Sequence, residues 1–142
     1  MGRVSRFEID LDLAQTMIEA AQSVAASDGI AVSIAVVDAG GNLIAFARMD
    51  GAEIAGPVLA VDKAYTAVAH RVATGELTAL VAPQGELAGM YAAHGGRYIT
   101  FPGGLPCWDE DRVVGGIGVS GGTADQDRRC AESALTLYLK AK

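Results

Sequence analysis

The stretch from residue 112 to residue 123, RVVGGIGVSGGT, constrains the fold more than any other part of the sequence. Because side chains alternate between the two faces of a strand, Gly116, Gly118 and Ser120 share a face with almost no side chains. Glycine weakens the interior of a strand, and it usually indicates that a helix, another backbone or a flat ligand comes close. We expect a central strand with a recess above this face that is open to a ligand.

The same stretch matches the pattern G-x-G-x-x-G between Gly116 and Gly121. In dinucleotide-binding proteins this pattern follows a strand, opens a helix and precedes a second strand with an acidic residue about 20 positions on. Here the glycines lie within the strand, and only one helix's length of chain remains after them. We therefore exclude a dinucleotide site.

The length and charge of the chain limit its class. With 142 residues it suits a single domain over residues 1–142, and its net charge of −6 argues against a nucleic-acid partner. No apolar run approaches the ~18 residues of a membrane span, and no apolar segment follows the basic residues near the start. We expect a cytoplasmic protein with no membrane partner, in which Cys107 and Cys130 are free thiols.

Hydrophobic periodicity and turn signals predict an α+β domain. Helices are expected over 10–27, capped by Asp10 or Asp12, over 57–73, over 74–82 with Thr74 as the cap, and over 86–94. A last helix is expected from the capping box at Thr123 to the C-terminus. The glycines just before Thr123 suit plain helix capping better than anion binding, because Asp125 and Asp127 already supply negative charge to the first turn. Short turns connect the predicted strands, which favours an antiparallel sheet with helices packed against it. The five predicted strands are 30–37, 43–49, 97–101, 105–108 and 112–120.

The helix over 57–73 has two distinct faces. Its larger apolar residues are expected to meet the sheet: Val58, Val61, Tyr65, Val68 and Val72. Lys63, Thr66 and His70 are expected to point the opposite way, together with Leu59. This second face is either solvated or a subunit contact, or else Lys63 is an anion anchor or acid/base and His70 a proton carrier or metal ligand.

The segment from His94 to Gly104 concentrates polar and aromatic groups among glycines. Arg97 would pair with a carboxylate of a planar ligand, and Tyr98 or Phe101 would pack on its ring. The alternative is a tight turn in which glycine and proline only set the backbone angles. The residues alone leave these two interpretations open.

Five blocks of sequence resemble one family in the same order along nearly the whole chain. They are VSIAVVDAGGNL (32–43), ARMDG (47–51), DKAYTA (62–67), FPGGLP (101–106) and GGIGVSGG (115–122). The chain resembles the haem-binding-protein family that includes HbpS, GlcG and the C-terminal domain of PduO. The resemblance implies a profilin-like fold, with a five-stranded antiparallel sheet flanked by helices, and homo-oligomers.

Members of this family are linked to haem binding or degradation, to corrinoid or glycolate-utilisation gene clusters, and to lyase chemistry on hydroxylamino-aromatic acids. This chain departs from the haem-binding pattern because its first helix contains no histidine, where a related domain supplies an iron ligand. His70 and His94 are its only histidines, so they are the candidate metal ligands. Thr66 would be a weaker oxygen ligand.

Two functions follow from these observations, and we rank binding first. In a binding module, haem or another flat, carboxylate-bearing molecule would be held between subunits. The residues expected to contact it are Lys63, Thr66, Arg97, Tyr98, Phe101, Gly103 and Gly104. In a cofactor-independent lyase or isomerase acting on a small aromatic or hydroxy acid, Lys63 would be the acid/base, Asp50 would assist it, and Arg97 would hold the substrate carboxylate. A third hypothesis is an accessory protein without a ligand.

Overall fold

Strand β4 (Arg112–Ser120) lies inside the sheet, between β1 (Ser33–Asp38) and β3 (Gly104–Asp109). Strand β2 (Leu43–Arg48) pairs with β1 and completes an antiparallel sheet of order β2-β1-β4-β3. The computed structural model describes residues 2–142. The α+β class is confirmed. The predicted count of five strands is wrong, because the described residues form four.

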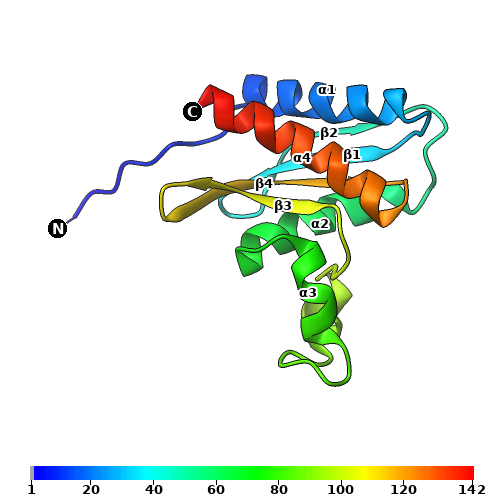
Figure 1. Ribbon diagram of the computed structural model, residues 1–142. Coiled ribbons are helices and arrows are strands. Elements are labelled where there is room, and N and C mark those ends of the chain that lie inside the picture. The colour runs from blue at the N-terminus through cyan, green and yellow to red at the C-terminus, as the bar shows by residue number, and fades with distance from the viewer. Residues whose placement is uncertain (1) are drawn as a thin grey trace.

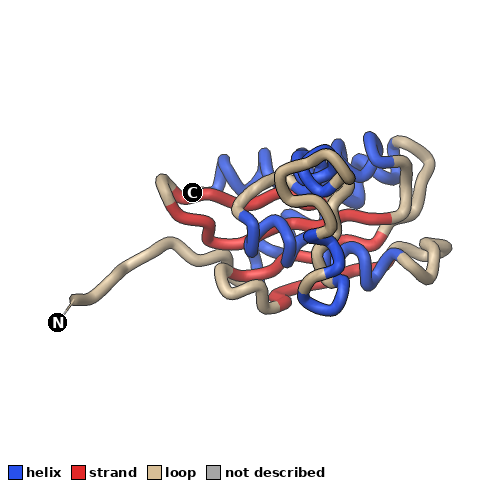
Figure 2. The backbone as a smooth tube through the Cα atoms, turned by 90° about the horizontal axis from the view of Figure 1, so that it is seen from below, coloured by secondary structure: helices blue, strands red, loops and turns tan. Residues whose placement is uncertain are grey.

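Helices cover both faces of the sheet. Helices α1 (Leu11–Ser27) and α4 (Ala124–Ala141) lie together on one face, and α2 (Gly56–His70) lies on the other (Figure 1). Seen from the α2 side, the helical and loop segments between β2 and β3 lie in front of the strands (Figure 2). The larger hydrophobic core is between the sheet and the pair of helices α1 and α4.

A long connection leads from α2 to β3. Helix α3 (Thr74–Val81) follows α2, and two short 3-10 turns, Met90–Ala92 and His94–Gly96, take the place of the helix predicted over 86–94. In Figure 1 this connection projects from the body of the molecule below α2. No helix within residues 2–142 is long and apolar enough to cross a membrane.

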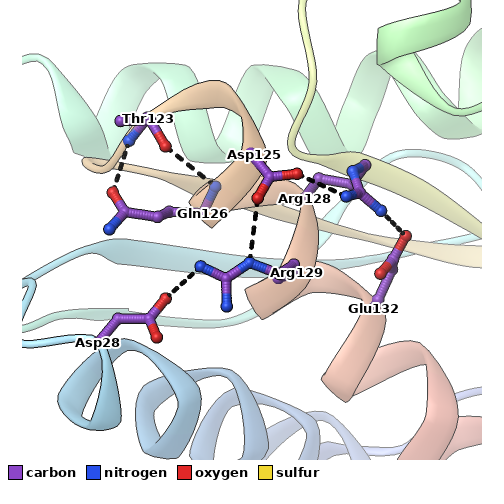
Figure 3. Close-up of polar contacts among 7 residues, drawn as sticks. All are labelled: Asp28, Thr123, Asp125, Gln126, Arg128, Arg129 and Glu132. Carbon is purple, nitrogen blue, oxygen red and sulfur yellow. Dashed lines mark hydrogen bonds and ion pairs between the residues drawn. The ribbon is translucent and has the colours of Figure 1, made fainter.

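The predicted caps at Asp10 and Thr123 are confirmed. Asp10 caps α1 by accepting a hydrogen bond from the Leu13 amide at 2.8 Å. At the start of α4, the Thr123 and Gln126 side chains each accept from the other's backbone amide, which completes the capping box (Figure 3). Figure 3 also shows Arg129 of α4 paired with Asp28 at the end of α1, at 2.7 Å.

The strand predicted over 97–101 is wrong, because threonine side chains occupy the hydrogen-bonding groups that a strand would use. The amide of Ile99 donates to Thr66 Oγ1 of α2 at 3.0 Å. The carbonyls of residues 100 and 101 accept from Thr78 Oγ1 at 2.5 Å and Thr74 Oγ1 at 2.7 Å. With its backbone groups satisfied by α2 and α3, this segment has no need of a neighbouring strand. For the same reason Thr74 anchors a loop and does not cap α3.

The glycine face of β4 is in close contact with α2, so the expected open recess is not present. A Cβ atom at Gly118 would collide with the Ala60 carbonyl oxygen and lie 2.6 Å from the Ala64 amide nitrogen. A Cβ atom at Gly116 would lie 2.8 Å from the Ala64 carbonyl oxygen. Of the three causes that favour glycine in a strand, the approach of a helix is therefore the one that applies here.

This close approach also explains why the predicted orientation of α2 is only partly right. Val61 and Val68 pack against the core on this side as expected, but alanines form the part of α2 next to the glycines. Only small side chains fit between α2 and the glycines, so Ala60 and Ala64 face the sheet and are fully buried. Val58, which was expected to face the sheet, is 67% exposed. Lys63 was expected to face away, and it is fully buried instead.

Candidate functional site

Six side chains from α2 and the loop before β3 form what we call the aromatic cluster: Asp62, Tyr65, His70, His94, Arg97 and Tyr98. The Tyr65 ring stacks with that of His94 at a centroid distance of 5.5 Å, and with that of Tyr98 at 6.3 Å. The His70 ring meets Tyr98 edge-on at 4.6 Å. The structure thus brings together four predicted site residues, His70, His94, Arg97 and Tyr98.

Arg97 connects the loop to α2 through charge and stacking. Its Nε donates to Asp62 Oδ1 at 3.0 Å, and its guanidinium carbon lies 3.5 Å from the centroid of the Tyr65 ring. A guanidinium over an aromatic face is attracted by the ring quadrupole. Within residues 2–142, its two Nη nitrogens form no hydrogen bond and no ion pair.

Thr66 fixes the position of the loop that carries Arg97. Its Oγ1 donates to the Asp62 carbonyl at 2.7 Å and accepts from the Ile99 amide at 3.0 Å. Thr66 is fully buried. Its expected contact with a ligand stays a prediction, and in this structure its hydroxyl holds the loop against α2.

The two histidines have different environments. His94 is exposed, its Nε2 lies 3.2 Å from the Tyr65 hydroxyl, and its φ of 54° lies in the left-handed region. The Nε2 of His70 is buried, and no group within residues 2–142 hydrogen-bonds to it. Among the described residues, no three or more His, Cys, Asp or Glu side chains are grouped as a metal site. A metal bound at the aromatic cluster would therefore have one or two histidine nitrogens as ligands.

Lys63 belongs to a second, buried group. Its Nζ donates to the Val119 carbonyl at 2.8 Å and to Asp127 Oδ2 at 3.0 Å, and its side chain is 1% exposed. Burial lowers the pKa of Lys63 and raises the pKa of Asp127, while the attraction between the two charges opposes both shifts. The Phe101 ring lies 5.0 Å from the Lys63 ammonium.

The remaining predicted site residues divide between this group and the surface. A Cβ atom at Gly103 would lie 2.7 Å from Lys63 Nζ, and one at Gly104 would collide with the Lys63 carbonyl oxygen. These two glycines therefore allow the loop to pack on Lys63. Asp50 is exposed and forms no side-chain hydrogen bond or ion pair with residues 2–142. The structure gives Asp127, and not Asp50, as the partner of Lys63.

Sequence reasoning missed three residues of these groups. Tyr65 was assigned to the core because it follows the apolar valines of α2, and Asp127 was interpreted only as a favourable charge in the first turn of α4. Asp62 lies one residue before Lys63 within the block DKAYTA. That block was the available signal, because it places two charges, an aromatic ring and a hydroxyl within two helical turns.

Comparison with known proteins identifies the family. Residues 9–136 match the model of the family described as haem degrading protein HbpS-like. The chain belongs to the HbpS-like family. An uncharacterized 15.0 kDa protein of Citrobacter freundii, from the dhaT-dhaS intergenic region, is 39% identical over 130 residues. The alignment covers 92% of this chain and 92% of that protein. The members named by the sequence resemblance are confirmed as relatives or structural neighbours: HbpS, GlcG and PduO.

Solved structures show the same fold. Protein ORFY of Klebsiella pneumoniae is 36% identical, with a TM-score of 0.93 over 98% of this chain and 97% of that one. A complex of PduOC with haem is 33% identical, with a TM-score of 0.89 over 92% of this chain and 95% of that one. For the relative PduO, a corrinoid adenosyltransferase, the aligned part is 32% of its length.

Proposed function

We propose that this HbpS-like protein binds haem, or another flat, carboxylate-bearing molecule, at the aromatic cluster. The observation that carries the proposal is the stacking of Tyr65 with His94, Tyr98 and the Arg97 guanidinium. A flat ring packs on aromatic faces, and a carboxylate pairs with a guanidinium fork. The haem complex of PduOC supports haem as the first ligand to test.

The side chains of the cluster fit haem. Histidine is a common axial ligand of haem iron, and His94 is exposed to solvent, so a bound haem could reach it. His70 holds an unpartnered Nε2 behind Tyr98, so it would serve only after Tyr98 moves. The Nη atoms of Arg97 would pair with a propionate. Bound haem would supply an iron centre, and the protein would orient it.

The lyase or isomerase hypothesis has less support. It requires Lys63 to reach a substrate, but the Lys63 ammonium is held by Val119 and Asp127 and its side chain is 1% exposed. Asp50, its expected helper, forms no contact with it. Binding is the function that the observed geometry favours.

Titration of the full chain with haemin, followed by the Soret absorbance, tests the proposal. We expect a saturable shift with one haemin per chain. His94→Ala should weaken binding by at least roughly 10-fold, since loss of second-shell support alone has effects of that size at metal sites. Tyr98→Ala should weaken it through loss of stacking. Tyr91→Ala is the matched control, because Tyr91 is an exposed tyrosine in the same loop that lies outside the cluster.

Two results would contradict this function. The first is the absence of any Soret shift with the wild-type chain. The second is a shift that Tyr91→Ala weakens as much as Tyr98→Ala does, which would indicate non-specific adsorption of haemin.

We also propose that the protein is a homo-oligomer. A mostly apolar groove between β2 and α2 is lined by Leu43, Phe46, Pro57, Val58, Val61 and one charged residue, Asp62. Two of these side chains, Leu43 and Val58, are more than half exposed, and such patches mark contact sites. Val58→Asp should lower the mass measured by light scattering, whereas Leu139→Asp, at an equally apolar exposed position on α4, should not. A monomeric wild-type chain would refute the proposal.

A further inference from the structure

Tyr65 also lines a cleft of about 480 Å³ that is distinct in composition from the aromatic cluster. Three arginines line this cleft, and they come from distant parts of the sequence: Arg6 before α1, Arg71 directly after α2, and Arg112 at the start of β4. The turn between β1 and β2 forms another part of the wall. We call this site the arginine cleft.

The charge of the arginine cleft is opposite to that of the whole chain. Its lining contains three guanidinium groups and one carboxylate, Asp111, in a protein of net charge −6. Within residues 2–142, Arg71 and Arg112 form no ion pair and no side-chain hydrogen bond. Arg6 pairs only with Glu8, at 3.4 Å and in an exposed position, where such a pair contributes little.

The backbone at Arg71 indicates that its side chain has a role. Arg71 has φ 56° and ψ 42° and ends α2 in the left-handed conformation. Glycine is the residue that favours this position, and any other L-residue costs roughly 1–2 kcal/mol there. The C-terminal end of the helix favours a positive charge. An arginine at this point therefore places a cation at the edge of the cleft at some expense in backbone energy.

The part of the cleft wall formed by the turn between β1 and β2 is preformed. A Cβ atom at Gly41 would lie 2.6 Å from Tyr65 Cδ2, so the turn packs directly on the tyrosine ring. The turn itself is held by Asp38 Oδ1, which accepts from the amides of Gly40 and Asn42 at 2.9 Å each. A ligand entering the cleft would meet this fixed surface and the three arginines that also line the cleft.

We propose that the arginine cleft binds the carboxylate or phosphate groups of a small organic anion. Guanidinium forks pair with both groups in a bidentate manner, and three forks suit a ligand with two anionic groups or one dianion. This inference goes beyond the proposed function, because the ligand needs neither a flat ring nor iron. The cleft and the aromatic cluster share only the ring of Tyr65.

The test uses the full chain, labelled with ¹⁵N, in low-salt Tris-chloride buffer. Succinate is the dicarboxylate probe and inorganic phosphate is the phosphate probe, each titrated to roughly 10 mM, well above the millimolar dissociation constant of a weak site. We expect saturable amide shifts at Gly40, Gly41, Arg71 and Arg112 with at least one probe. The probe that binds more tightly identifies the anionic group.

Arg71→Gly removes the charge while it suits the left-handed backbone, so this variant should keep its fold, as checked by thermal unfolding. It should weaken binding about 10-fold, which corresponds to ~1.4 kcal/mol, and Arg71→Lys should recover part of the affinity. Arg48→Gln is the matched control, since Arg48 lies on β2 and does not line the cleft. The proposal is overturned if neither probe gives saturable shifts, or if Arg48→Gln weakens binding as much as Arg71→Gly. Loss of haemin binding with intact anion shifts would refute only the proposed function.

Discussion

Lys63 of α2 and Asp127 of α4 form a buried ion pair that joins the helices on opposite faces of the sheet. The distance from Nζ to Oδ2 is 3.0 Å, and the two side chains are 1% and 5% exposed. Asp127 Oδ1 also accepts from the Gly122 amide at 2.8 Å, and Lys63 Nζ donates to the Val119 carbonyl. The pair thus ties both helices to the end of β4.

The first prediction concerns the stability of this pair. Lys63→Met should lower the free energy of unfolding by about 3–5 kcal/mol, because it leaves a buried carboxylate without its partner. The double variant Lys63→Met/Asp127→Asn keeps an acceptor for Gly122 and removes both charges, so it should be closer to the wild type than Lys63→Met alone. Urea unfolding measures all three. A double variant that is no more stable than Lys63→Met would show that the two charges are not coupled.

The second prediction concerns pH. Burial raises the pKa of Asp127 above 3.8, so the folded state binds the carboxyl proton more tightly than the unfolded state does. The contribution of Asp127 to stability should therefore fall as the pH rises from 3.8 through its folded pKa. Burial lowers the pKa of Lys63 below 10.5, so its contribution should rise with pH from its folded pKa to 10.5. The difference in unfolding free energy between the wild type and the double variant, measured across the pH range, isolates the contributions of Asp127 and Lys63. A difference that increases from pH 4 to neutrality would contradict the assignment for Asp127.

The third prediction concerns the contact between β4 and α2. Gly118→Ala should destabilise the protein by about 3 kcal/mol or more, at or above the upper end of ordinary overpacking, because the added methyl meets the backbone of Ala60 and Ala64. Gly40→Ala is the control, since the three atoms nearest to its methyl would all be side-chain atoms, beginning with the Asn42 amide nitrogen at 3.0 Å. Chemical unfolding measures both variants. Equal, small losses of unfolding free energy in both variants would mean that α2 can move away from β4 at little cost in free energy.

The fourth prediction concerns the two free thiols. Burial raises the pKa of Cys107 to about 12 and that of Cys130 to about 11. Because the thiolate is the reactive form, neither cysteine should react with a disulfide reagent such as DTNB at pH 8 in the native protein. Both should react rapidly in guanidinium chloride. Rapid labelling of one thiol under native conditions would show local opening around that residue.

Several features of the fold were predictable because neighbouring residues determine them. The cap at Asp10, the capping box at Thr123 and the turn that begins at Asp38 each depend on hydrogen bonds between groups up to four residues apart. Such interactions depend only on residues close together in the sequence, so a pattern of residue types is enough to identify them. The predicted free cysteines are confirmed for a related reason, since the spacing of Cys107 and Cys130 matched no disulfide or metal motif.

The candidate site was predictable only in part. Arg97, Tyr98 and the two histidines were named from their chemistry, and the structure brings them together with Tyr65. The strand assigned to residues 97–101 was wrong, because its backbone groups are satisfied by Thr66, Thr74 and Thr78 from two helices. The alternation of apolar residues cannot show which distant side-chain hydroxyl will form a hydrogen bond with a backbone amide or carbonyl. The profilin-like fold and the homo-oligomeric assembly stay predictions.

The sequence by itself determined the family, the α+β class, the helix caps, the hairpin and the need for a close neighbour at the glycine face of β4. Only the tertiary structure decided that α2 is this neighbour, that Lys63 faces inward to Asp127, and that Arg6, Arg71 and Arg112 line one cleft. The physical reason is distance along the chain. Lys63 and Asp127 are 64 residues apart, and which of two helical faces is buried depends on the volume left by the opposing strand, which no local pattern records.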